Sequence, residues 1–128
     1  PRNSLGGLCA RLAGKERKAM QDLLNELQDR SKVLDQALAA FGKRGRAYAE
    51  AERQYRVGLN KKIVEERDKG TPVTIISDIC RGDEAIAELK FQRDVAETAY
   101  KAAMEAINVY KLNIKVLEEQ IQREWNCK

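Results

Sequence analysis

The stretch Ile86–Ile121, IAELKFQRDVAETAYKAAMEAINVYKLNIKVLEEQI, decides the fold. Its apolar residues follow alternating steps of three and four positions, which repeat every seven residues and keep one stripe facing a partner helix. The members of this stripe are Ile86, Leu89, Ala96, Tyr100, Ala103, Ile107, Tyr110, Ile114, Leu117 and Ile121. Arg93 and, just beyond the stretch, Glu124 interrupt the series. The pattern predicts one long helix with a single apolar seam.

An earlier stretch of the chain repeats this pattern. Its apolar positions are Leu24, Leu27, Leu34, Leu38, Phe41, Tyr48, Tyr55 and Leu59, and its interruptions are Ser31, Gly45, Glu52 and Lys62. Two matched stripes predict an all-α fold, a long antiparallel coiled-coil-like hairpin with arms at about 22–69 and 83–126. If the chain reverses near residue 76, the numbers of opposed residues sum to about 152. Ile63 then meets Leu89, and Tyr48 meets the smaller Ala103.

A second apolar stripe lies on the later helix, away from the seam. Its members are Phe91, Val95, Ala102, Val109, Leu112 and Val116. A two-helix hairpin buries only one face of each helix, so a second apolar face asks for another partner. We therefore expect a homodimer with four helices, or a host or phage protein on the same face. The alternative is that these side chains sit singly on the surface, as many apolar residues do.

The linker 70–82, GTPVTIISDICRG, contains the least generic sequence of the chain. Gly70 suits the left-handed end of the first helix, and Pro72 prevents its continuation. Thr74 is expected to cap a short helix that runs through Arg81. Val73, Ile75, Ile76 and Ile79 are expected to cover the end of the hairpin. Two alternatives are a protein-binding tip at Ile75, Ile76 and Ile79, and a helix-turn-helix, which would need a basic recognition helix after it.

The net charge of +4 is concentrated at the start of the chain. Residues 1–19 contain five basic residues and one acidic residue, so residues 20–128, the helical hairpin, are neutral. Lys15-Glu16 can be encoded as AAG-GAG, a ribosome-binding sequence placed just before Met20. One hypothesis is therefore that residues 1–19 are a non-native extension of a protein that begins at Met20. The alternative is a flexible basic leader.

Several kinds of chemistry are disfavoured by composition. The sequence has no histidine, which removes the commonest acid–base and metal-binding side chain. Cys9, Cys80 and Cys127 lack the spacing of a zinc or redox motif, and no glycine-rich phosphate loop occurs. We expect no catalytic, cofactor-binding or metal-binding residues, and no enzyme. No apolar run is long enough to span a membrane, so a cytoplasmic location is the default expectation.

A resemblance rests on several short motifs. They are Ala51-Glu52-x-x-Tyr55-Arg56-Val57-x-Leu59, the linker run Gly70–Asp78 with Arg81-Gly82, and the later runs Ala106–Leu112 and Arg123-Glu124-Trp125. Over about residues 45–125 the chain resembles small uncharacterised helical proteins encoded in prophages of Gram-positive gut bacteria. The resemblance implies a phage protein in the cytoplasm of a bacterial host. It carries no assigned activity.

Two functions from different classes are compatible with these observations. The first is a non-enzymatic phage accessory protein that acts by protein–protein interaction, one version of which inhibits a bacterial defence system, as anti-CRISPR proteins do. The alternative is a nucleic-acid-associated factor of phage replication or recombination. The neutral helical body favours the first function, because nucleic-acid binding needs an uncompensated basic face.

Overall fold

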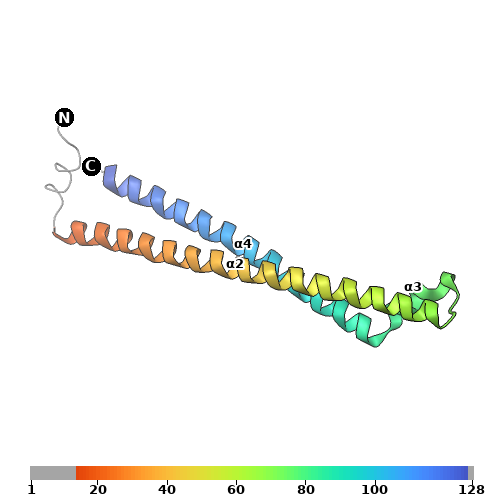
Figure 1. Ribbon diagram of the computed structural model, residues 1–128. Helices are drawn as coiled ribbons and strands as arrows, with labels where there is room; N and C mark the ends of the chain where they lie inside the picture. Colours follow the sequence, from red (N-terminus) through yellow and green to blue (C-terminus); the bar gives the residue numbers. More distant parts are fainter. Residues whose placement is uncertain (1–13, 127–128) are drawn as a thin grey trace. The chain divides into compact units, whose positions relative to one another are not determined.

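The computed structural model describes residues 14–126, which form three α-helices (Figure 1). Helix α2 spans Gly14–Asp68, α3 spans Val73–Gly82 and α4 spans Glu84–Asn126. No strand occurs within residues 14–126, so the predicted all-α class is confirmed. Helix α2 begins ahead of the expected arm, and residues 1–13 of the basic leader lie outside the described residues.

None of the three helices, over the residues that the structure describes, is both long and apolar enough to cross a membrane. The chain divides into two compact units, which we describe in turn. The first unit combines α2 up to Leu38 with α4 from Ala106 onward. The second contains residues 39–105, and therefore the end of α2, the whole of α3 and the start of α4.

In the first unit, the start of α2 packs against the end of α4. Ile107 and Leu117 of the predicted seam are buried, and Arg30 donates a hydrogen bond across the pair to the Asn113 carbonyl oxygen at 3.4 Å. Leu24 and Leu38 were expected in the seam but are exposed, and the half-buried positions are the preceding residues, Leu23 and Ala37. A helix with 3.6 residues per turn drifts against a seven-residue repeat, which moves the inward position by one residue.

In the second unit, aromatic side chains pack across the two helices. The Tyr100 ring of α4 stacks on Phe41 with centroids 5.0 Å apart, and it lies 5.7 Å from the ring of Tyr48. Gly45 gives this ring room, since a Cβ atom there would lie 3.2 Å from Tyr100 Cε1. Tyr48 therefore meets Tyr100. The expected pairing had placed Tyr48 opposite Ala103.

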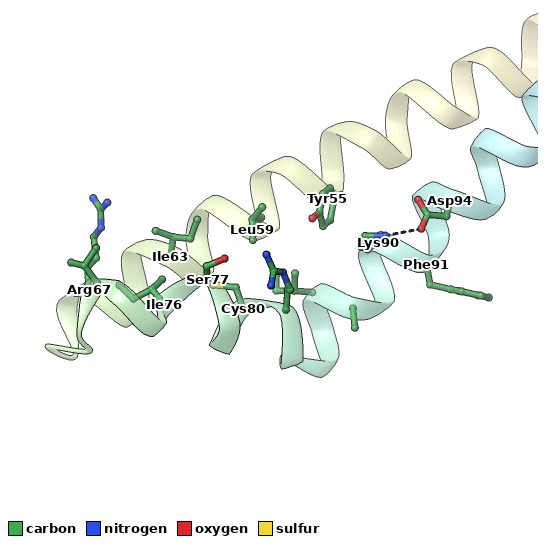
Figure 2. A pocket seen from close by; sticks show the side chains of 14 residues that line it. Tyr55, Leu59, Ile63, Arg67, Ile76, Ser77, Cys80, Lys90, Phe91 and Asp94 are labelled. Atoms are coloured by element: carbon green, nitrogen blue, oxygen red, sulfur yellow. Dashed lines mark hydrogen bonds and ion pairs between the residues drawn. The ribbon is translucent and has the colours of Figure 1, made fainter.

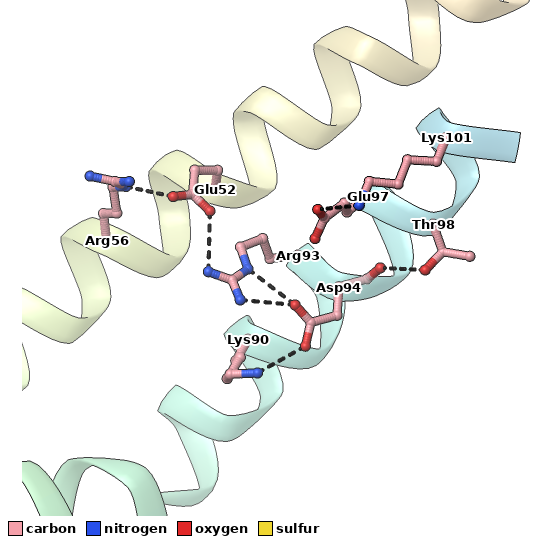
Figure 3. A network of polar contacts seen from close by, with 8 residues as sticks. All are labelled: Glu52, Arg56, Lys90, Arg93, Asp94, Glu97, Thr98 and Lys101. Carbon is pink, nitrogen blue, oxygen red and sulfur yellow. Dashed lines mark hydrogen bonds and ion pairs between the residues drawn. The ribbon is translucent and has the colours of Figure 1, made fainter. Parts of the chain in front are cut away.

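Charged interruptions of the apolar stripes pair with charged residues across the hairpin. Glu52 pairs with Arg93 at 3.4 Å, as Figure 3 shows, and Lys62 pairs with Asp83 at 3.4 Å. The numbers in each pair sum to 145, as they do for Gly45 and Tyr100, so the expected sum of 152 is wrong by one heptad. A shift of seven residues keeps the same stripes in contact, which is why the seam of α4 was predicted correctly.

The short helix α3 explains this shift. Figure 1 shows α3 beside the last turns of α2, so α4 begins opposite residues that lie well before the end of α2. The chain was expected to reverse in the middle of the linker, between two helical arms of equal length. In the structure α3 covers the end of α2 in place of the start of α4, which displaces α4 by about 10 Å for seven residues.

The end of α2 has the predicted left-handed cap. Gly70 has φ 84°, the Thr71 amide donates to the Glu66 carbonyl at 3.1 Å, and the Gly70 amide donates to the Arg67 carbonyl at 3.0 Å. This pair of hydrogen bonds is a Schellman motif. The expected cap at Thr74 is wrong, because α3 begins at Val73 after Pro72 and has no side-chain cap hydrogen bond.

Helix α3 buries only part of the apolar linker. Ile76 is 5% exposed and Cys80 is 2% exposed, because residues four apart lie on one face of a helix. Ile79 is half-buried, whereas Val73 and Ile75 are exposed. The expectation that all four apolar residues of the linker cover the end of the hairpin is therefore correct for Ile76, in part for Ile79, and wrong for Val73 and Ile75.

Two carboxylates, those of Glu66 and Asp83, stabilise the helix ends at this end of the hairpin. Glu66 is 5% exposed and accepts a hydrogen bond from the Thr71 hydroxyl at 2.9 Å, while Lys62 lies 3.2 Å from it and Lys69 3.3 Å. The Thr71 hydroxyl first, and then Lys62, lower the pKa of Glu66. Asp83 caps α4 by accepting from the Ile86 amide at 3.1 Å, and this hydrogen bond is the main cause of its lowered pKa.

We expect acid to weaken this end of the hairpin. Glu66 and Asp83 have lowered pKa values in the folded chain, so their contribution is complete above the ordinary carboxyl range and is lost as the pH falls through the folded values. The free energy of unfolding, measured with urea, should fall between about pH 5 and pH 3. Glu66→Gln should make the fall shallower, and Glu118→Gln, at an exposed position of α4, should not. Equal slopes in the two variants would contradict the role of Glu66.

Candidate protein-binding surfaces

The outer face of α4 is exposed in both units. Phe91 is 58% exposed in the second unit and Leu112 is 60% exposed in the first. The six residues of the predicted second stripe, all of them exposed, are Phe91, Val95, Ala102, Val109, Leu112 and Val116. The seam residues of α4, in contrast, are all buried or half-buried. The structure therefore leaves this face open, and its role as an interface stays a prediction.

A shallow hollow lies on this face in the second unit. It measures ≈ 450 Å³ and is lined by Phe91, Asp94, Val95, Thr98, Ala99 and Ala102. The Thr98 hydroxyl donates to the Asp94 carbonyl at 3.0 Å, so its own polar group is satisfied along the helix. A ligand in the hollow would consequently contact mainly the apolar side chains of Phe91 and Val95, and few polar groups there could bind water or a polar ligand instead.

A larger cleft lies where α2, α3 and α4 meet in the second unit (Figure 2). It measures ≈ 690 Å³. The buried side chains of Ile76, Cys80 and Ile86 line it, and the half-buried side chains of Leu59 and Ile63 form the α2 wall. Phe91 and Asp94 line both this cleft and the hollow on α4. The cleft is therefore apolar in its depth and borders the hollow on α4 within the same unit.

Charged side chains surround the cleft. Its lining contains three cations, Arg67, Arg81 and Lys90, and one carboxylate, Asp94. Lys90 lies 3.0 Å from Asp94 and Arg93 lies 2.9 Å from the same carboxylate. Hydrogen bonds from Lys90 and then from Arg93 lower the pKa of Asp94. Asp94 is thus already shared by two cations, and the lining keeps an excess of positive charge.

The three isoleucines of the expected linker tip lie in different surroundings. Ile76 lines the cleft, Ile75 is exposed, and Ile79 is half-buried outside the cleft lining. Sequence reasoning missed the cleft because it paired Ile63 with Leu89. In the structure Leu89 lies against Gly58, where a Cβ atom would come within 2.5 Å of Leu89 Cδ1. The absence of a side chain at Gly58 is the sequence signal that could have identified it as the residue opposite Leu89.

Reactive side chains do not gather in the part of the chain that the structure describes. Among residues 14–126, no three Cys, Asp or Glu side chains lie close enough together to hold a metal ion. Cys80 is a free, buried thiol, while Cys9 and Cys127 lie outside the described residues. Tyr48, Tyr55 and Tyr100 are half-buried and contact one another, Phe41 or Arg93. This arrangement favours the packing role expected for the tyrosines.

Comparison with known proteins gives no relatives. No family model, curated protein or solved structure matches the chain. Origin in a prophage therefore stays a prediction that rests on the sequence motifs alone.

Proposed function

We propose that this chain is a non-enzymatic protein that acts by binding other proteins through its helical surfaces. The observation that carries the proposal is the exposed outer face of α4, with Phe91 and Leu112 more than half exposed. Removing such a side chain from water is worth about 1.5–3 kcal/mol. A row of them on one helix face therefore favours association more than it favours an isolated hairpin.

A second copy of the chain is the first partner that we propose. A pair of helices buries one face of each, and a thin pair has little core of its own. A twofold axis that brings the α4 faces of two copies together would bury the same residues on both. The proposed result is a dimeric four-helix assembly, and a host or phage protein could use the same face in place of the second copy.

The setting of this interaction is proposed from the resemblance to prophage proteins. It would be the cytoplasm of a bacterial host, where the chain would act without a cofactor, for example as an inhibitor of a defence system of the anti-CRISPR kind. This version predicts that expressing the chain in a host with an active defence system raises phage plating. The neutral charge of residues 20–128 supports protein binding over nucleic-acid binding.

The oligomeric state tests the proposal. Leu112→Asp should split the dimer while circular dichroism shows unchanged helicity, because a buried unpaired carboxylate is costly. Asn108→Asp adds the same charge at an exposed position of α4 outside the stripe, and it should leave the dimer intact. Light scattering that finds a single 14.5 kDa species for the unaltered chain at micromolar concentration would contradict self-association. DNA binding that weakens steeply with salt would support the nucleic-acid alternative.

A further inference from the structure

We propose that the cleft between α2, α3 and α4 binds an acidic amphipathic helix of a partner protein. This inference extends the proposed protein-binding function to a second surface, which the sequence did not indicate. It uses the second unit alone, because every residue that lines the cleft belongs to residues 39–105. Its support is the shape of the cleft, the apolar character of its depth and the charge around it.

The length of the cleft matches a short helix. Along α2 its lining follows four-residue steps, Tyr55, Leu59, Ile63 and Arg67. Twelve residues of helix extend for about 18 Å, which is the length of roughly three turns of a bound helix. Three turns present apolar anchors at positions i, i+4 and i+7, the spacing by which amphipathic helices enter apolar grooves.

The depth of the cleft suits apolar anchors. Cys80 and Ile76 are almost fully buried, and Ile86 is buried beside them on α4. These side chains offer no strong hydrogen-bonding group to a ligand. Within residues 14–126, no buried side-chain nitrogen or oxygen lacks a hydrogen-bond partner, so apolar anchors would cover no unsatisfied buried polar group in this depth. Leucine-like side chains would gain from burial without leaving a polar group unpaired.

The excess of positive charge around the cleft favours a bound helix whose apolar anchors are flanked by acidic residues. Arg67 and Lys90 lie at opposite ends in Figure 2. Arg67 is exposed, and no carboxylate among the described residues pairs with its guanidinium. Arg81 pairs with Asp78 at 3.4 Å, but both side chains are at least 75% exposed, so this pair is weak and open to exchange. Glutamates flanking the apolar anchors of a bound helix could therefore pair with Arg67 and Arg81.

A pair of synthetic peptides tests the proposal on the full chain. Each peptide is a helix of about fifteen residues with leucines at i, i+4 and i+7, and the remaining positions carry alanine with either glutamate or lysine. Fluorescence anisotropy should show that the glutamate peptide binds at least about tenfold more tightly than the lysine peptide, and more weakly as salt rises. Equal affinities, or no binding by either peptide, would overturn the proposal.

Variants of the cleft locate the binding. Arg67→Glu combined with Arg81→Glu should weaken the glutamate peptide by about tenfold, because both side chains are exposed and neither supports the core. Arg44→Glu combined with Arg46→Glu makes the same double charge reversal at exposed sites on α2 outside the cleft and should have no effect. Ser77→Trp, at an exposed residue of the lining, should block the cleft and abolish binding. Unchanged binding by the Ser77 variant would place the peptide elsewhere and overturn the assignment.

The two binding surfaces can be separated with one further variant. Leu112→Asp lies in the first unit and should keep full affinity for the glutamate peptide even if it splits the dimer. If the unaltered chain is monomeric but binds the glutamate peptide, that result would contradict self-association and support the cleft. A dimeric chain that ignores the peptide would do the reverse.

Discussion

Replacing Leu117 with alanine should lower the free energy of unfolding by about 2–5 kcal/mol, the usual range for truncating a buried leucine. Leu117 is 4% exposed in the seam of the first unit, so the truncation leaves a cavity that the rigid helix pair closes only in part. Urea denaturation followed by circular dichroism measures the change. Ile114 is half-buried in the same unit, and its truncation should cost less.

Leu112→Ala is the matched control for this experiment. It removes the same atoms from the same helix at a position that is 60% exposed. At concentrations where the chain is monomeric, it should change the free energy of unfolding by less than about 0.5 kcal/mol. Equal losses at Leu112 and Leu117 would show that the inward face of α4 has been assigned wrongly.

A valine at Gly45 should destabilise the second unit by about 1–3 kcal/mol, the usual cost of overpacking. Its Cβ atom would lie 3.2 Å from Tyr100 Cε1, and Tyr100 cannot easily withdraw because Phe41 stacks on its ring and Tyr48 lies beside it. Thermal unfolding followed by circular dichroism gives the shift in Tm.

Gly42→Val isolates the steric effect. The two glycines lie on the same helix, and a Cβ atom at Gly42 meets nothing within 4 Å. Valine is a better helix former than glycine by a few tenths of a kcal/mol, so this control should be neutral or slightly stabilising. Since the gain in helix propensity is the same at both sites, the difference between the variants measures the contact with Tyr100. Identical Tm values would contradict the observed pairing of α2 with α4.

The seam of α4 could be predicted from sequence because seven-residue periodicity reports which face of a helix is buried. All its members, from Ile86 to Ile121, are buried or half-buried. Periodicity does not report which heptad faces which, because a shift of seven residues restores the same apolar contacts. Matching large residues to small ones therefore selected a wrong partner for Tyr48. Matching Glu52 to Arg93 would have selected the observed register.

The linker was predictable where local chemistry determines it. A glycine followed by proline predicts a left-handed helix end, and Gly70 has that conformation. The course of α3 depends on contacts between residues distant in sequence, such as those that bury Ile76 and Cys80, and no local pattern encodes them. The cleft forms from that course together with the register, so sequence reasoning alone could not place it.

The pairing of Glu52 with Arg93 has a consequence for how the chain reaches its structure. If the helices of the second unit zipped together one heptad out of step, Glu52 would face Tyr100 and Arg93 would face Leu59. Each charge would then lose its partner on the opposite helix in a partly dehydrated environment, which is costly, and would keep only Arg56 or Asp94 on its own helix. We therefore expect the mispaired species to be less stable than the observed register. The polar pair in the seam would then favour the correct register during folding, which an uninterrupted apolar stripe would not do.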